Sequence, residues 1–177
     1  MPVDTVARCR AIANAMVTDI NTEIAAKQSD GTAIAPARFT ARVNYYPEYT
    51  LAQLGNVVVD IRIVESHTEA ESRNGIFLIH EIEITVQKAI RYADSGATDA
   101  ISLLVDLAFR IAKFYQENCE PCGADSSGHS SMVTAFGANY PLECTASVLT
   151  IYDPIRLHDF GHFWSMLALT WRENVSS

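Results

Sequence analysis

The chain has 177 residues, with 13 Lys and Arg against 21 Asp and Glu, so its formal net charge is −8. Hydrophobic residues make up 49% and charged residues 19%, which excludes a disordered chain and suits one folded domain over residues 1–177. The acidic charge excludes a protein that holds nucleic acid mainly through its phosphates. No apolar stretch approaches the ~18 residues that span a bilayer, and the first residues show no secretion signal. We therefore expect a soluble, cytoplasmic domain without membrane contact.

Hydrophobic periodicity in the first half predicts one helix followed by strands. The helix is expected over residues 4–27, where apolar residues recur at three- and four-residue spacing. This buried stripe consists of Val6, Ala13, Met16, Val17, Ile20 and Ile24. The period then changes to two, which predicts half-buried strands over residues 39–45, 56–64 and 76–88.

The second half repeats this order. A helix over residues 98–117 is apolar on more than one side, so we expect it to be well buried. An irregular loop rich in Gly, Ser and Pro follows over residues 118–131, and two strands are expected over 143–152 and 161–173. The predicted fold class is therefore α+β: an N-terminal helix, a three-stranded antiparallel meander, a second helix and two further strands, forming a sheet packed by helices.

A polar connection over residues 65–75 separates two strands that we expect to pair antiparallel. It is longer than a tight turn requires, and long loops are often functional. Just after it, Phe77 and Ile79 point outward from their strand. Two interpretations of these side chains remain open: contact with a neighbouring subunit, or ordinary packing under the second helix.

Cys119 and Cys122 form the motif in the sequence that most strongly suggests enzyme chemistry. A redox pair of this spacing needs its first thiolate at a helix N-terminus, but this pair follows the C-terminal end of a helix, where the helix dipole disfavours a thiolate. A zinc site would have to combine the pair with two of His129, His158 and His162, at a spacing much wider than that of zinc fingers. We favour a loop with two free thiols.

The remaining polar motifs are weaker. The segment His158–His162 has no accompanying nucleophile signal. Glu81 and Glu83 share one face of a strand, which is typical of a solvent-exposed face. Cys9 and Cys144 are expected to be small buried hydrophobes, and the glycines form no phosphate-binding loop. We therefore expect no catalytic residue, no metal and no cofactor.

Four segments resemble the tail terminator (tail completion) proteins of long-tailed bacteriophages. They are Leu54–Val64, Ile82–Ile90 with the core ITVQK, Asp99–Ala108 and Phe163–Arg172. The resemblance covers roughly residues 54–173, and the order of helix, three strands, helix and returning strands is also similar.

The resemblance implies a structural virion protein of the tail or neck, assembled in the host cytoplasm, and no enzyme. Its subunits would form a homo-oligomeric ring, usually a hexamer, that caps the tail tube and contacts the adjacent tube and head–tail connector proteins. DNA would pass through the lumen without specific binding, and the acidic charge is compatible with such a conduit. The expected subunit-interface residues are Glu65, His67, Glu69, Glu71, Arg73, Phe77 and Ile79.

Two alternatives remain open at this point. One is another phage neck or tail protein, such as a head-completion stopper or a tube subunit. The other is a small metal- or thiol-dependent enzyme that uses Cys119 and Cys122.

Overall fold

The computed structural model of the chain describes residues 5–21, 39–45, 48–72, 75–91, 96–117 and 142–174. Its helices are α1 (Thr5–Asp19), α2 (Ala97–Glu117) and α4 (Pro154–Phe160), with a short 3-10 helix, η2 (Leu51–Leu54). Its strands are β1 (Phe39–Val43), β2 (Val57–Ser72), β3 (Gly75–Ala89), β4 (Leu142–Thr150) and β5 (His162–Asn174). The described residues form an α+β fold, which confirms the predicted class.

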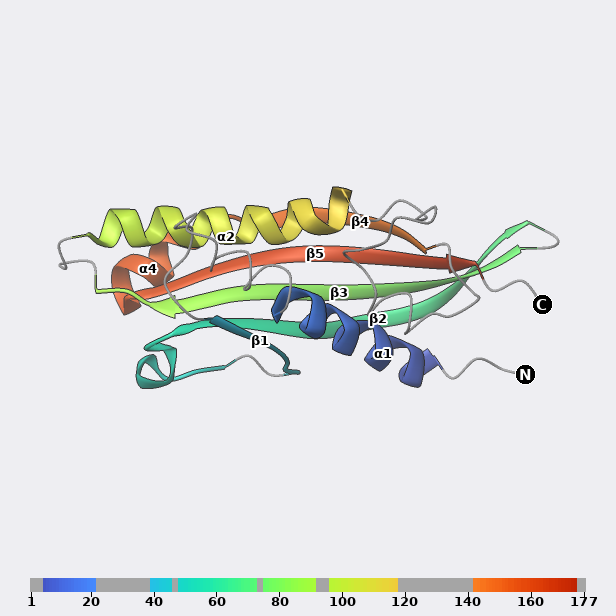
Figure 1. The fold of residues 1–177 in the computed structure, drawn as a ribbon, viewed down its shortest axis with the longest axis horizontal. Coiled ribbons are helices and arrows are strands. Elements are labelled where there is room, and N and C mark those ends of the chain that lie inside the picture. The colour runs from blue at the N-terminus through green and yellow to red at the C-terminus, as the bar shows by residue number, and fades with distance from the viewer. Residues whose placement is uncertain are drawn as a thin grey trace.

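The strands form one mixed sheet in the order β1-β2-β3-β5-β4 (Figure 1). The strands β2, β3, β5 and β4 pair antiparallel, whereas β1 lies parallel to β2, with Phe39 opposite Val57. The predicted antiparallel meander is therefore wrong at its first strand. The reason is the connection that carries η2, because it returns the chain to the end of the sheet where β1 begins. Tyr49 in this connection donates a hydrogen bond to the Asp60 carboxylate at 2.7 Å and so fastens it to β2.

The hairpin of β2 and β3 is much longer than predicted. Its ladder runs from Val58 opposite Gln87 to Ser72 opposite Gly75, and residues 73–74 lie outside the described part. The expected long loop over 65–75 is therefore wrong. Backbone hydrogen bonds hold this polar stretch in the sheet, although it lacks the apolar alternation that predicts a strand. In Figure 1 the hairpin extends past α1 and α2 at one end of the molecule.

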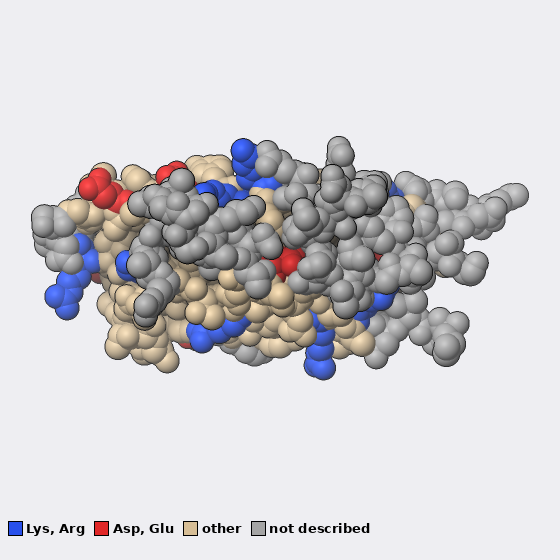
Figure 2. Space-filling view, viewed as in Figure 1, with Lys and Arg blue, Asp and Glu red and all other residues tan. Residues whose placement is uncertain are grey.

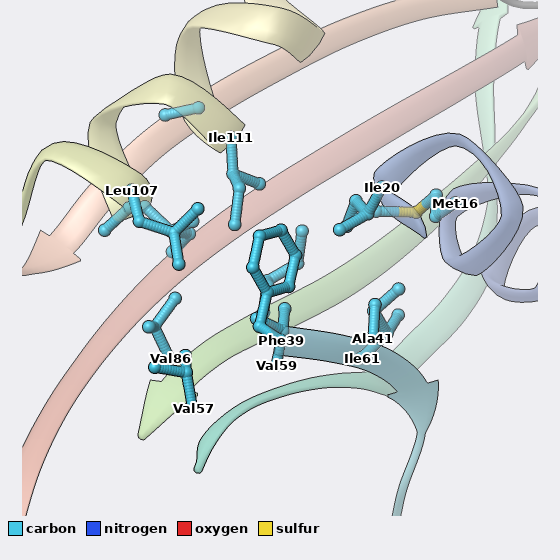
Figure 3. Packing of buried hydrophobic residues seen from close by; sticks show 14 of the residues in the cluster. Met16, Ile20, Phe39, Ala41, Val57, Val59, Ile61, Val86, Leu107 and Ile111 are labelled. Carbon is cyan, nitrogen blue, oxygen red and sulfur yellow. The ribbon is translucent and has the colours of Figure 1, made fainter. Parts of the chain in front are cut away.

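The hydrophobic core lies between one face of the sheet and the helices α1 and α2. Phe39 lies near its centre, with Ile20, just after α1, on one side and Leu107 and Ile111 of α2 on the other (Figure 3). Val59 on β2 contributes to the sheet side of the same cluster. Because successive side chains alternate across a strand, the residues between these core positions line the opposite face of the sheet.

The structure contains a helix that was not predicted, α4, between β4 and β5. The side chain of Asp153 accepts hydrogen bonds from the backbone N–H groups of Ile155 and Arg156 at 2.9 and 3.0 Å and caps its N-terminus. Pro154 occupies the first helical position, where a missing N–H costs nothing. Gly161 ends the helix at φ +62°, and its carbonyl accepts a hydrogen bond from Ile90 N at 2.8 Å.

The other elements agree with the periodic patterns. The helix α2 matches the predicted helix over 98–117, and β4 and β5 match the strands predicted over 143–152 and 161–173. The helix α1 covers the first part of the helix predicted over 4–27, of which residues 4 and 22–27 lie outside the described part. The Asn21 side chain, just after α1, bonds both backbone groups of Ala41 and ties this helix to β1. None of the described helices is both long and apolar enough to cross a bilayer.

Candidate functional site

The sheet face opposite α1 and α2, here called the open face, brings together the residues predicted to form an interface. The ladder of β2 and β3 places Glu69 opposite Phe77 and His67 opposite Ile79. Glu65 follows on the same face, opposite Glu81. Five of the seven predicted residues therefore form two adjacent rows. The side chain of Glu71 and all of Arg73 lie outside the described part.

Phe77 and Ile79 do not lie under the second helix. The helix α2 covers the other face, where Ile82 and Ile84 are buried in the same core cluster as residues of α2. Phe77 and Ile79 are each partly exposed on the open face, and the Arg172 guanidinium lies 3.8 Å from the centre of the Phe77 ring. Of the two earlier interpretations, packing under α2 is wrong, and both side chains lie on a face that a neighbour can reach.

The open face carries an unusual pair of like charges. Glu65 and Glu81 are direct register partners on adjacent strands, and carboxylates in this arrangement repel each other. The neighbouring position carries an ion pair between Arg62 and Glu83. A basic side chain from a partner would relieve the repulsion between Glu65 and Glu81, so this end of the open face favours a partner of opposite charge.

A second cluster is buried between α1 and the sheet. Arg8 of α1 binds the Glu173 carboxylate through Nε, at 3.2 and 3.1 Å from the two oxygens, and through a terminal nitrogen at 2.5 Å. His80 Nε2 lies 3.8 Å from the other side of the same carboxylate. The hydroxyl of Ser66 lies 2.7 Å from His80 Nδ1 and 3.0 Å from the thiol of Cys9. We call these five residues the α1 network.

The α1 network shifts the pKa values of His80 and Glu173. Burial has the largest influence on the pKa of His80 and lowers it, but interactions with Cys9 and Glu173 outweigh burial, so the pKa is raised above 6.5. Burial raises the pKa of Glu173, yet the neighbouring His80 imidazole and the Arg8 guanidinium outweigh burial, and the pKa is lowered below 4.5. Both shifts favour the charged forms, since each charge has its partner in place.

Sequence reasoning missed the α1 network. Cys9 was predicted to be buried, and it is, but nothing in its spacing indicates contact with Ser66 on a distant strand. Arg8 and Glu173 are 165 positions apart. The only available signal was a polar His80 in the apolar, even-numbered row of β3, which demands a buried partner.

A pocket of about 420 Å³ opens beside the α1 network at the outer edge of β2. It lies where β1 has ended, between α1 and the middle of β2. Its lining includes Cys9 and Ser66 from the network and the apolar side chains of Val6, Tyr45 and Val64. The nucleophilic groups of the network therefore lie next to a space that a small molecule or a protein side chain can occupy.

The motifs that suggested metal or redox chemistry are not brought together by the described residues. Cys119, Cys122 and His129 lie outside the described part. His158 is exposed on α4 beside Asp159, with 2.8 Å between its Nδ1 and the carboxylate. His162 at the start of β5 lies 3.0 Å from the Gln87 side-chain oxygen. Within the described ranges, no three His, Cys, Asp or Glu side chains are grouped as metal ligands.

Comparison with protein-family models gives no match for this chain, and comparison with curated protein sequences gives none either.

Proposed function

We propose that the chain is a structural virion protein, a subunit of a ring that caps the phage tail tube and joins it to the neck. The observation that carries this proposal is the one-sided architecture of the sheet. The helices α1 and α2 cover one face, while the hairpin part of the open face presents Phe77 and Ile79 beside Glu65 and Glu69, and the hairpin extends past these helices. A monomeric protein gains little from such a surface, whereas a subunit can bury it against a neighbour or an adjacent virion protein.

The charge arrangement supports a contact that sets orientation. Glu65, Glu69 and Glu81 gather on the hairpin part of the open face, beside two apolar side chains. Acidic groups at the rim of an apolar contact steer a basic partner surface and reject a wrong register. We propose the open face as the surface that docks onto the tube or the connector.

The distribution of basic residues supports a lumen that does not retain DNA. The described Lys and Arg side chains visible in Figure 2 are spread along the molecule instead of being gathered in one patch. Together with the net charge of −8, this disfavours retention of phosphates. DNA would then move past the ring without specific binding. A stopper or a tube subunit would use the same surfaces at another position along the tail axis.

A complementation experiment tests this function. A phage that lacks the gene for this chain is grown in cells that supply either the wild-type chain or the variant Phe77→Asp with Ile79→Asp. The wild-type chain should restore joined heads and tails in electron micrographs, and the variant should leave them separate. Val58→Asp, on the same face at the other end of β2, is the matched control. Joined particles with the double variant would refute the docking role.

The α1 network supports a second candidate, a small enzyme that acts through a nucleophile. Ser66, His80 and Glu173 follow one another as hydroxyl, imidazole and carboxylate, and the pocket reaches Ser66. This candidate predicts that a fluorophosphonate probe labels Ser66 and that His80→Gln abolishes the labelling. The structural proposal predicts no labelling of the folded chain, with a serine hydrolase as the positive control.

A further inference from the structure

The α1 network places a thiol, a hydroxyl and an imidazole in one chain of contacts. The Ser66 hydroxyl donates a hydrogen bond to Cys9 Sγ at 3.0 Å, and its oxygen lies 2.7 Å from His80 Nδ1. A protonated imidazole has no acceptor nitrogen, so His80 then donates to Ser66 while Ser66 donates to the sulfur. The sulfur of Cys9 is therefore the acceptor at which this chain ends.

The charges of the network favour a thiolate at that end. In mildly acidic solution Arg8 and His80 are positive and Glu173 is negative, which leaves one surplus positive charge beside α1. A thiolate on Cys9 balances this charge. An adjacent imidazolium favours the thiolate of a cysteine, and the thiolate is the nucleophilic form.

The pocket beside the network gives a small molecule access to this sulfur. Cys9 is only 2% exposed, but it lines the pocket of about 420 Å³ at the edge of β2. Val6, Tyr45 and Val64 supply apolar lining on the other sides. Val6 was predicted to belong to the buried stripe of the first helix, but it is 61% exposed. A small molecule in the pocket therefore lies against both the sulfur and apolar side chains.

The titratable and charged groups around Cys9 come from four described elements and from the end of β1. They are Arg8 and Arg10 of α1, Tyr45 after β1, Glu65 of β2, His80 of β3 and Glu173 of β5. Arg10 and Glu65 line the pocket with opposite charges, so their effects on the sulfur oppose each other. The charges of Arg8 and Glu173 pair with each other. His80 is therefore the cation that the sulfur can use, and an uncharged ligand suits the pocket.

We propose that Cys9 is a modification site whose sulfur adds to a small, uncharged α,β-unsaturated carbonyl compound in the pocket. Sγ forms a bond to the β-carbon, and the π electron pair of the double bond moves toward the carbonyl. The α-carbon then takes the proton that His80 held, passed on through the Ser66 hydroxyl. The product is a thioether, and the addition needs no leaving group, oxidant or reductant.

An addition fits this buried site better than a displacement. Before the step, the Cys9 thiolate and the His80 imidazolium balance each other, as Arg8 and Glu173 do. After the step, the thioether and the imidazole are both neutral, so no charge is left without its partner. A displacement by the same sulfur would leave the imidazolium buried without the thiolate, and an unpaired buried charge is costly.

Reaction with N-ethylmaleimide, a neutral compound of this class, tests the site. In a chain with Cys119→Ser and Cys122→Ser, Cys9 and Cys144 are the remaining thiols, and peptide mass spectrometry follows both in one sample. From about pH 8 to about pH 6 the rate at an ordinary thiol falls about a hundredfold, and we expect this fall at Cys144. The rate at Cys9 should fall less than about tenfold. At the lower pH Cys9 should thus react faster than Cys144, although Cys144 is more exposed.

The variant His80→Gln identifies the source of this reactivity. Without the imidazolium, the rate at Cys9 should fall about a hundredfold over the same pH range, as at an ordinary thiol. A looser fold alone would change access to the sulfur at both pH values alike, so the ratio of the two rates separates the charge of His80 from its packing. His158→Gln, at an exposed position of α4, is the matched control and should leave the ratio unchanged.

Three results would each overturn the proposal. They are a rate at Cys9 no faster than at Cys144 at the lower pH, the same pH dependence at Cys9 with and without His80→Gln, and an equal effect of His158→Gln. The first comparison uses no variant of the network, so it decides the matter even if His80→Gln does not fold. The site lies beside α1 and not on the open face, so the inference does not depend on the proposed virion function.

Discussion

Ser66 on β2 and His80 on β3 lie directly opposite each other, with 2.7 Å between the hydroxyl oxygen and Nδ1. This pairing exists because Val64 is left out of the ladder. A regular continuation of the register from Ile63 opposite Ile82 would place Ser66 opposite Ile79, on the open face. The bulge thus turns Ser66 toward α1 and, by the same shift, turns Glu65 to the open face. One irregular residue separates the α1 network from the proposed docking surface.

Removal of Arg8 should destabilise the fold strongly. Glu173 is fully buried, and Arg8 supplies its strongest hydrogen bonds. Among the described residues, Arg8→Met leaves the buried carboxylate with His80 as its remaining charged partner, and we expect the free energy of unfolding to fall by about 3 kcal/mol. Urea denaturation measures the change, with Arg10→Met on the same helix as the exposed control. A loss in the control as large as that in Arg8→Met would contradict the importance of the ion pair.

The α1 network should stabilise the protein most in mildly acidic solution. The raised pKa of His80 means that its contribution is complete below 6.5 and is lost as pH rises through the folded-state pKa. The lowered pKa of Glu173 means that its contribution is complete above 4.5 and is lost as pH falls through the folded-state pKa.

The variant His80→Gln tests the alkaline side of this pH dependence. Between about pH 6 and about pH 9, the wild type should lose more free energy of unfolding than His80→Gln, because only the wild type has an imidazolium at position 80 to lose. Urea denaturation at both pH values gives the comparison. Equal losses in the two proteins would mean that His80 is already neutral in the folded state at pH 6.

The C-terminus of α4 should not tolerate a side chain. Gly161 has φ +62°, and a Cβ there would lie 2.9 Å from the carbonyl oxygen of Ile90. Gly96 also has a positive φ, of +99°, but a Cβ there meets nothing within 4 Å. Backbone strain costs about 1–3 kcal/mol at either position, and the clash adds only to Gly161→Ala. Thermal unfolding should therefore rank Gly161→Ala below Gly96→Ala, and the reverse order would contradict the described contact.

The open face should matter for docking more than for folding. Phe77→Thr and Ile79→Thr each remove a partly exposed side chain from a strand position that Thr tolerates, so we expect a loss of about 1 kcal/mol or less per site. Val58→Thr is the matched control on the same face. Pull-down of tail-tube or connector protein should weaken with the first two substitutions and not with the control. Equal binding by all three variants would remove Phe77 and Ile79 from the docking surface.

Much of the fold follows from periodicity. The alternation of Ile82 and Ile84 with Glu81 and Glu83 predicted both the strand and the face that contacts the helices, because a half-buried strand repeats every two residues. The same rule failed beyond Val64, where polar residues occupy both faces of β2 and only the backbone ladder shows that the strand continues. For that reason the pattern predicted a loop where the outer part of the hairpin lies.

Other features depend on information that spacing does not contain. The short helix α4 has readable boundary signals in Asp153, Pro154 and Gly161, but its seven residues provide too few turns for a clear period. The parallel pairing of β1 with β2 depends on the end of the sheet to which the connection between these two strands returns the chain. The α1 network depends on the bulge and on the contact of Arg8 with Glu173 across nearly the whole chain, and neither leaves a local signal.

The native mass of the purified wild-type chain tests the central claim, assembly into a closed ring, most directly. Light scattering over a wide range of concentrations should give one constant mass near that of a hexamer of the 19.5 kDa chain, because a head-to-tail contact that closes leaves no free patch for further growth. A monomer at every concentration, or a mass that keeps increasing with concentration, would contradict the account.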